Sequence, residues 1–198
     1  MTEIELKAHV DDRNALIELL NKKAVYKGRV CRDDEYYGKS ANDKHKIRIR
    51  RETTDTEQTY LVTYKRKELR TDQNGTTIEV NDENECSVSS PDALTTFLLD
   101  TGYTVQLKKH KDVMDWELEI PTSEGTAQKL TATFELCAVP PLGDFLEIEI
   151  LSPCSDPESV AKVHAKLEEL LGMTGIPKER IETRYYSEML RALNADNK

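Results

Sequence analysis

The chain has 198 residues, 37% of them hydrophobic, with a formal net charge of −9 and a sequence pI of about 5.1. This length suffices for one domain with a substantial core, and no Pro-, Gly- or Ser-rich linker divides it, so we predict a single domain over residues 1–198. The acidic balance argues against a nucleic-acid binder, which needs an excess of Lys and Arg to displace counterions. Any phosphate ligand therefore has to meet a local cluster of bases.

The sequence predicts a cytoplasmic protein that binds no membrane. No apolar run approaches the roughly 18 residues of a transmembrane helix, and the N-terminus lacks the basic-then-apolar pattern of a signal peptide. The four cysteines, Cys31, Cys86, Cys137 and Cys154, are far apart and form no CxxC pair. Neither a zinc site nor a disulfide framework is indicated, and we expect reduced, mostly buried thiols.

The first predicted element is a strand at residues 3–7, the stretch "EIELK". A helix follows over about residues 12–23, because Asp11 and Asp12 can cap it and leucines recur at helical spacing. Strands dominate the next part of the chain. They are predicted at 33–39, 44–51, 58–67 and 76–88.

A second helix is predicted to open at Ser90-Pro91-Asp92, where Ser caps and Pro takes the first turn, and to stop at Gly102. The remaining predicted elements are strands at 103–111, 113–120, 129–137 and 144–151, a helix at 157–171 that closes on Gly172, and an amphipathic segment at about 179–193. The predicted class is α+β, with about eight antiparallel strands and helices packed outside them.

Charged residues occupy every second position of several predicted strands. In "EIELK", Glu3, Glu5 and Lys7 share one face because side chains two apart on a strand point the same way. One such strand is typical of an ordinary solvated face. The same alternation recurs, however, in four later strands. It places together Lys46, Arg48 and Arg50; Lys65 and Lys67; Lys109 and Lys111; and Glu147 and Glu149.

These strands are also sorted by the sign of their charges. The first and last carry paired carboxylates and three others carry paired bases, whereas surface strands usually mix signs because like charges two apart repel. Closing an eight-stranded sheet into a barrel would turn one parity of every strand into a common lumen. A charged lumen covered outside by helices is sensible only if it binds a polyanion together with divalent cations.

"EIELK" resembles the ExExK signature of the CYTH superfamily, the triphosphate tunnel metalloenzymes. Further matches follow in the right order over nearly the whole chain. They are "DEYY" at 34–37, "IRIR" at 47–50, "TYK" ending at Lys65, the pair Lys109 and Lys111, "LGDFLEIE" at 142–149 and "RYYSEML" at 184–190. The resemblance implies an eight-stranded antiparallel closed β-barrel, or tunnel, whose lumen holds acidic and basic side chains.

The resemblance also implies roles for individual residues. Mg²⁺ or Mn²⁺ would be bound by Glu3, Glu5, Glu147 and Glu149. Lys7, Lys65, Arg48 and Arg50 would be catalytic, and the triphosphate would be bound by Lys46, Lys67, Lys109, Lys111 and Arg184. The pair Glu83 and Glu85 matches an acidic lumen position, although such acids can also simply orient neighbouring bases.

The chain departs from the family pattern at Cys137, where many members have an Asp. Glu135 lies two residues earlier, on the same strand face. Our hypothesis is that its longer side chain supplies the missing metal-binding carboxylate. Lys111 also stands where an Arg is common, which keeps the charge.

Two reactions compete. The resemblance is strongest to class IV adenylyl cyclases, which convert ATP to cyclic AMP and pyrophosphate. The alternatives are an inorganic or thiamine triphosphatase, or a module that binds a polyphosphate or nucleotide without turning it over. No histidine pairs with a nucleophile in the sequence, so we expect His9, His45, His110 and His164 to be surface or packing residues. We also expect Trp116 to pack rather than to stack on a base. A second subunit could cover the apolar parity in place of helices, so a homodimer stays open.

Overall fold

The computed structural model describes residues 2–40, 46–71, 77–120, 130–153 and 156–196, and the side chains within them except those at 2, 65–71, 77–83 and 194–196. The chain divides into two compact units. Unit 1 comprises Met1–Arg29 and Lys111–Lys198, and unit 2 comprises Val30–His110. None of the described helices is long and apolar enough to cross a membrane.

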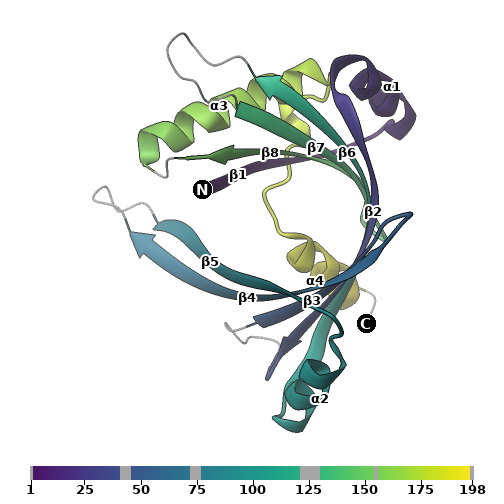
Figure 1. The fold of residues 1–198 in the computed structure, drawn as a ribbon. Coiled ribbons are helices and arrows are strands. Elements are labelled where there is room, and N and C mark those ends of the chain that lie inside the picture. Colours follow the sequence, from purple (N-terminus) through teal and green to yellow (C-terminus); the bar gives the residue numbers. More distant parts are fainter. Residues whose placement is uncertain (1, 41–45, 72–76, 121–129, 154–155, 197–198) are drawn as a thin grey trace. The chain divides into compact units, whose positions relative to one another are not determined.

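Eight strands form one sheet, in the order β1-β8-β7-β6-β2-β3-β4-β5 (Figure 1). The strands are β1 (Thr2–His9), β2 (Val25–Gly38), β3 (Lys46–Thr53), β4 (Gln58–Thr71), β5 (Thr77–Val88), β6 (Thr104–Ile120), β7 (Leu130–Val139) and β8 (Gly143–Ser152). The helices are α1 (Arg13–Lys23), α2 (Asp92–Asp100), α3 (Pro157–Met173) and α4 (Tyr186–Asp196), with a 3-10 turn η1 (Lys178–Arg180). The predicted α+β class with eight antiparallel strands is confirmed. Because β1 and β5 are the two ends of the hydrogen-bonded order, closure into a tunnel stays a prediction.

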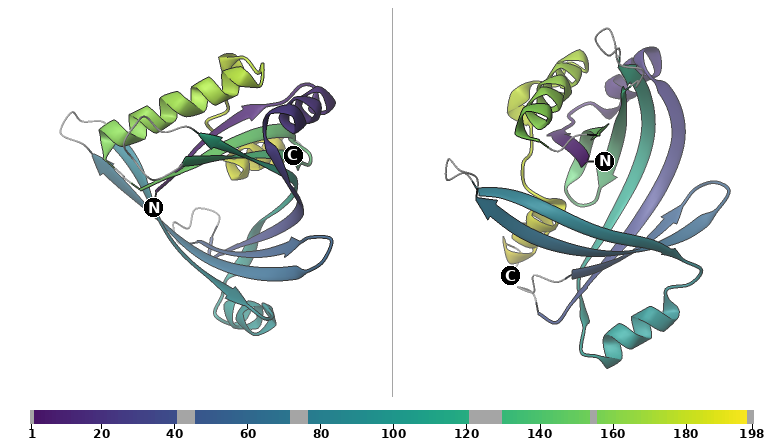
Figure 2. Two further views of the ribbon diagram at one scale, coloured as in Figure 1. Left: turned by 45° about the horizontal axis from the view of Figure 1, so that its top comes forward. Right: turned by 60° about the vertical axis from the view of Figure 1, so that its left-hand side comes forward.

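Unit 1 has its core between the sheet and the helices α1 and α3 (Figures 1 and 2). The strands contribute their apolar parity, such as Leu6 of β1 and Ile148 of β8, and α3 contributes Leu167 and Leu171. Trp116 is fully buried in this core, and its Nε1 donates to Asn21 Oδ1 at 2.8 Å. The predicted packing role of Trp116 is therefore confirmed.

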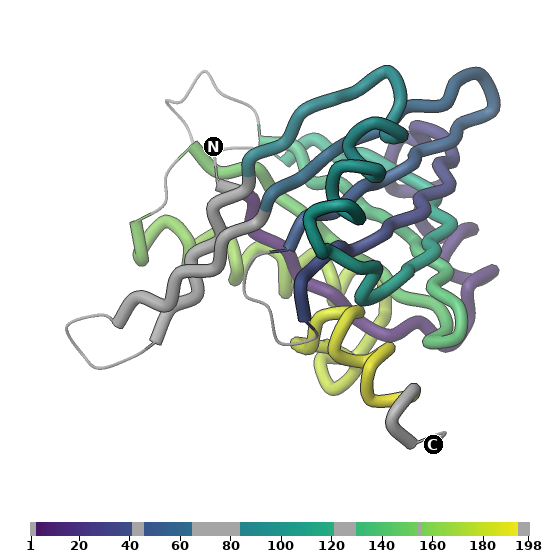
Figure 3. Tube along the Cα trace, turned by 90° about the horizontal axis from the view of Figure 1, so that it is seen from below, coloured from purple at the N-terminus to yellow at the C-terminus, as the bar shows by residue number. Residues whose placement is uncertain are grey.

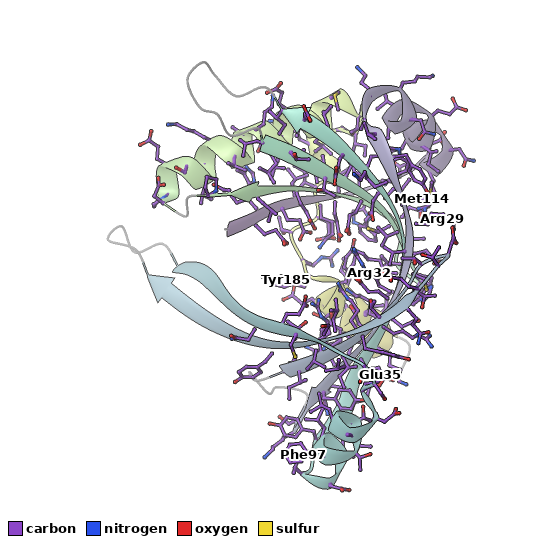
Figure 4. The ribbon with its side chains drawn as sticks, viewed as in Figure 1. Arg29, Arg32, Glu35, Phe97, Met114 and Tyr185 are labelled. Carbon is purple, nitrogen blue, oxygen red and sulfur yellow. The ribbon has the colours of Figure 1, made fainter. Side chains whose placement is uncertain are left out.

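Unit 2 has a smaller core, in which α2 packs on the strands (Figure 3). Leu98 of α2 meets Tyr37 of β2 and Ile49 of β3, all three of them buried. Arg32 and Glu35 extend from opposite faces of β2, as expected for residues an odd number apart on a strand (Figure 4). In both units, therefore, the helices cover the apolar parity of the strands.

Two predicted element boundaries were wrong in the centre of the chain. The strands expected at 103–111 and 113–120 form one 17-residue strand, β6, because no Gly or Pro lies at 111–113 to break it. β2 begins at Val25, eight residues earlier than expected. Its first part contains Gly28, whose φ of 144° lies in a region that only glycine readily adopts, so the pattern did not indicate a strand there.

Helix ends and cysteine burial also differ from expectation. α3 passes through Gly172 to Met173, and the left-handed glycine that follows is Gly175. α2 begins at Asp92, so Pro91 precedes the helix instead of lying in its first turn. Ser90 still accepts a hydrogen bond of 3.2 Å from the backbone N–H of Asp92. The segment at 179–193 divides into η1 and α4.

Of the cysteines that the structure describes, Cys137 is buried, Cys31 is half-buried and Cys86, on the terminal strand β5, is exposed. Cys154 lies outside the described residues.

The core of unit 1 generates a stability prediction. Ile148 is fully buried beneath α3, so Ile148→Ala should lower the free energy of unfolding by about 2–5 kcal/mol through lost burial and an incompletely filled cavity. Equilibrium denaturation in urea measures this loss.

Leu151→Ala is the matched control, because Leu151 lies on the same strand but on its other face and is 54% exposed. Its unfolding free energy should change by less than about 0.5 kcal/mol. Equal losses in the two variants would contradict the assignment of the two faces.

Candidate functional site

In unit 1 the charged parity of β1 and β8 lies on the face opposite the helix-covered core. The register pairs Glu5 with Glu149 and Lys7 with Glu147 across the two strands. The alternate residues, including Leu6 and Ile148, are core residues. The alternation along β1 therefore separates its two faces. The apolar residues are buried under helices, and the charged residues lie together on the other face.

Three carboxylates gather at one end of this face. One oxygen from each of Glu3, Glu5 and Glu149 lies within 4.8 Å of the others. Crowding by protein atoms and by the nearby charges of Glu147 and Glu3 raises the pKa of Glu5 to about 7, although part of its surface meets solvent. Burial together with the surrounding glutamates raises the pKa of Glu149 to about 8. These raised pKa values reflect burial and repulsion among the clustered carboxylates, which a bound proton or cation would relieve.

Lys111 lies between two further carboxylates of unit 1. Its Nζ donates to Glu135 Oε2 at 2.9 Å and also to Glu147 Oε2, and all three residues are buried. Cys137 contacts the same Glu147 oxygen through Sγ at 3.6 Å, and burial raises the pKa of its thiol. Glu135 therefore lies beside Cys137 and Glu147, as the sequence hypothesis requires, but a lysine ammonium binds it.

Lys7 is held by the segment before α4. Its Nζ donates to the backbone oxygen of Arg184 at 2.6 Å and lies 4.5 Å from the centre of the Tyr186 ring. The side chain of Arg184 bonds Glu182 instead, and these bonds lower the pKa of Glu182 to about 2. Arg184 is thus placed beside Lys7 through its backbone, while its guanidinium is largely exposed.

The same end of unit 1 has a hollow of about 320 Å³. Its walls are mostly apolar or aromatic. They are formed by His9, Pro141, Leu142, Phe145, Arg184, Met189, Ala192 and Leu193. Phe145 stacks against His9 and meets Tyr186 edge-on, with ring centres 4.5 and 5.0 Å apart. Along the β1–β8 pair, Glu5 therefore lies opposite Glu149, Lys7 opposite Glu147 and His9 opposite Phe145.

In unit 2 the charged parity carries bases around one buried carboxylate, Asp34. Arg50 binds it with two hydrogen bonds of 2.7 and 3.1 Å, and Lys109 Nζ lies 3.0 Å away. Burial alone would raise the pKa of Asp34, but the bonds from Arg50 and the charge of Lys109 outweigh it and hold the pKa well below its usual range. Asp34 therefore holds Arg50, predicted to be catalytic, beside Lys109, predicted to bind the triphosphate.

Arg48 lies next along β3 on the same face. Its Nη2 donates to Thr63 Oγ1 at 2.9 Å and to Glu85 Oε2 at 3.2 Å, and Thr63 also donates to Glu85 at 2.6 Å. Arg48 Nε is buried and has no hydrogen-bond partner within the described part of the chain. Glu85 therefore orients the neighbouring Arg48. This was the alternative role that the sequence left open for the pair Glu83 and Glu85.

Register places the remaining predicted residues near these bases. Lys65 pairs with Lys46 on β3 and with Glu83 on β5, and Lys67 pairs with Asn81. The side chains of Lys65, Lys67 and Glu83 lie outside the described residues. Their roles, and the sharing of one lumen by the two charged faces, stay predictions.

Sequence reasoning assigned no role to several residues that organise the site. Asp34 and Tyr186 stood inside quoted motifs, and Asp34 shares its strand parity with no other carboxylate, which was the available signal. Thr63 stood inside "TYK" as well, but its contact with Arg48 and Glu85 depends on the pairing of three strands, which no local pattern indicates. His9 packs on Phe145 and His164 is at the surface, as expected, while His45 lies outside the described residues.

The acidic cluster fits a hard divalent cation. Mg²⁺ and Mn²⁺ prefer oxygen ligands, and Mg²⁺ usually takes one or two carboxylates together with phosphate oxygens. Glu3, Glu5 and Glu149 can present three oxygens to one ion. A bound cation would also relieve the repulsion that raises the pKa values of Glu5 and Glu149.

Solved structures with the same fold come from archaea, bacteria and plants. The PH1819 protein of Pyrococcus horikoshii is 23% identical, with a TM-score of 0.70 over 96% of this chain and 99% of that one. A candidate adenylate cyclase of Vibrio parahaemolyticus is 17% identical, with a TM-score of 0.66 over 96% and 97%. A candidate adenylyl cyclase of Hippeastrum, described as having a dominant triphosphatase activity, is 16% identical, with a TM-score of 0.60 over 96% of both chains.

At these identities the structural matches show the shared fold alone. A search of curated proteins gave no match. The sequence model of the CYTH domain matches residues 1–186, which is nearly the whole chain. The chain therefore belongs to the CYTH domain family.

Proposed function

We propose that this protein is a metal-dependent enzyme that acts on a nucleoside triphosphate, specifically an adenylyl cyclase that converts ATP to cyclic AMP and pyrophosphate. One observation carries the proposal: opposite each helix-covered core lies a charged face, acidic in unit 1 and basic in unit 2. A triphosphate needs bases to bind it and divalent cations to accompany it. The chain supplies one face for each.

The bases of unit 2 suit phosphate oxygens. Arg50 and Lys109 are held in place by Asp34, so little side-chain entropy would be lost when an anion binds. Arg48 keeps one buried N–H without a partner in the described residues, and a phosphate oxygen would satisfy it. We propose Arg48, Arg50 and Lys109 as triphosphate-binding residues, and assign Lys46, Lys65 and Lys67 the same role from the sequence.

The metal would be bound by Glu3, Glu5 and Glu149. A divalent cation there would neutralise phosphate charge and favour displacement at phosphorus. Lys111 already bonds both Glu135 and Glu147, so we propose that these two carboxylates position a lysine rather than bind the ion in this arrangement. Lys7, fixed on Arg184 and Tyr186, provides a second ammonium near the carboxylates.

The hollow beside Lys7 favours a nucleotide over inorganic triphosphate. Its volume of about 320 Å³ and its largely apolar lining suit a base better than a phosphate chain. In the cyclase reaction the ribose 3′-oxygen forms a bond to the α-phosphorus, the bond from that phosphorus to the bridging oxygen breaks, and pyrophosphate leaves. The proton of the hydroxyl is released.

A triphosphatase is the second candidate, in which water attacks a terminal phosphorus. The dominant triphosphatase activity named for the Hippeastrum protein supports it, because that chain shares this fold. Most of the charged residues would serve either reaction. The hollow argues against inorganic triphosphate as the substrate, but it would serve hydrolysis of an organic triphosphate as well as cyclisation of ATP.

Two glutamine variants distinguish a carboxylate proposed to bind the metal from one that bonds Lys111. Glu149→Gln should weaken Mn²⁺ binding by about tenfold or more, because it removes one of three clustered ligands. Glu135→Gln should leave Mn²⁺ affinity nearly unchanged, because Glu135 binds Lys111. Isothermal titration of each variant with Mn²⁺ measures both.

The reverse ranking, with Glu135→Gln the weaker binder, would overturn this assignment. It would support instead the hypothesis that Glu135 replaces the carboxylate that many family members have at the position of Cys137.

The reaction itself is tested by incubating the protein with Mg²⁺ or Mn²⁺ and, separately, ATP, inorganic triphosphate or thiamine triphosphate. We expect cyclic AMP and pyrophosphate from ATP. Orthophosphate as the main product would establish the triphosphatase. Protection against thermal unfolding without any product would establish a binding module.

The role of the hollow is tested with Ala192→Trp, which places a bulky ring in its wall from an exposed position of α4. The KM for ATP should rise by roughly tenfold or more, as expected for a pocket of the wrong size, while stabilisation by inorganic triphosphate stays unchanged. Ala165→Trp, on an exposed position of α3, is the matched control and should alter neither. Equal weakening of both ligands by Ala192→Trp would contradict a base-binding hollow.

A further inference from the structure

His9 lies both on the wall of the hollow in unit 1 and on the charged face of β1. It is two residues beyond Lys7, so it shares the strand parity of Glu5 and Lys7. Its ring packs on Phe145, with the ring centres 4.5 Å apart, and both residues line the hollow. His9 is therefore the residue through which β1 meets an occupant of the hollow.

Glu182 determines which ring nitrogen of His9 carries a proton. Its Oε2 lies 3.3 Å from Nε2 of His9, and the carboxylate is almost fully buried. Arg184 donates to the same carboxylate through Nε, Nη2 and its backbone N–H, and these bonds lower the pKa of Glu182 to about 2. An ionised carboxylate only accepts hydrogen bonds, so Nε2 is the protonated nitrogen. Nδ1 of the uncharged imidazole then presents a lone pair.

The other described residues of the wall offer an occupant few hydrogen-bond donors. Pro141 has no backbone N–H, and that of Leu142 donates to the backbone oxygen of Val139 at 2.6 Å. The guanidinium of Arg184 bonds Glu182 through Nε and Nη2 and is largely exposed. An imidazole acceptor in this wall would therefore favour a ligand that donates.

We propose that His9 selects adenine by accepting a hydrogen bond at Nδ1 from the 6-amino group, and that Glu182 positions the imidazole for this contact. The inference rests on the proposed binding of a nucleotide base in the hollow and adds the residue that recognises the base. A 6-oxo purine would bring a second acceptor against Nδ1, so one hydrogen bond would be lost and two lone pairs would face each other. Spacing along the chain does not reveal the pair, because His9 and Glu182 are 173 residues apart.

Binding of two nucleotide analogues to the full chain with Mn²⁺ tests the proposal. They are analogues of ATP and of inosine triphosphate in which methylene groups replace both bridging oxygens of the triphosphate, so neither can be turned over. Inosine carries a 6-oxo group where adenosine has its amine. We expect the ATP analogue to bind about tenfold or more tightly than the inosine analogue, as measured by isothermal titration.

His9→Phe keeps a ring on Phe145 but removes both nitrogens. The affinity ratio of the two analogues should fall to about one, while the affinity for inorganic triphosphate stays unchanged. His164→Phe is the matched control, because His164 lies at the surface of α3, and it should keep the ratio. Equal affinities in the unaltered chain, or an unchanged ratio in His9→Phe, would overturn the proposal.

Glu182→Gln tests the positioning role. An amide can donate to Nε2 and so allow the proton to reside on Nδ1, which should lower the affinity ratio. A purely structural role of Glu182 would weaken both analogues alike and keep the ratio, and this result would reject the positioning role.

The product assay for the proposed function gives a separate answer. Cyclic AMP formation together with equal affinities would reject His9 as the selecting residue and keep the cyclase. Orthophosphate from ATP together with the expected ratio would reject the cyclase and keep the role of His9. A chain that binds inorganic triphosphate but neither analogue would overturn both.

Discussion

The alternation of apolar and charged residues along the strands is the constraint on which the rest of this structure depends. In unit 1, α1 and α3 bury the parity that contains Leu6 and Ile148, so Glu5 and Glu149 must lie on the opposite face. In unit 2, α2 buries Ile49, and Arg48 and Arg50 lie opposite. The hydrophobic effect thereby gathers like charges that would otherwise repel one another.

Each charged face handles that repulsion differently. In unit 2 the single carboxylate of Asp34 offsets Arg50 and Lys109, and Glu85 offsets Arg48, so the bases are fixed and partly neutralised. In unit 1, Lys111 offsets Glu135 and Glu147, but the carboxylates of Glu5 and Glu149 keep raised pKa values. The repulsion behind these raised pKa values is the repulsion that a bound divalent cation would relieve.

The alternation of residues along each strand could be predicted from the sequence. Contacts that depend on how neighbouring strands align could not. The alternation in "EIELK" and "FLEIEI" placed Glu3, Glu5 and Glu149 on one face, and the fold confirmed the strands that carry them. The contact of Lys111 with Glu135 and Glu147 requires three strands to align, and no local pattern encodes it. The break predicted between residues 111 and 113 was wrong, because Asp112 lies within a ladder, opposite Ala138.

The central claim is that carboxylates from the first and last strands hold a divalent cation on the face away from the helices. Anomalous scattering from Mn²⁺ in crystals grown with Mn²⁺ and an uncleavable ATP analogue tests it most directly. The account predicts an anomalous peak bounded by oxygens of Glu3, Glu5 and Glu149. A crystal whose manganese lies only elsewhere, with these three side chains bonded to lysine or water, would contradict it.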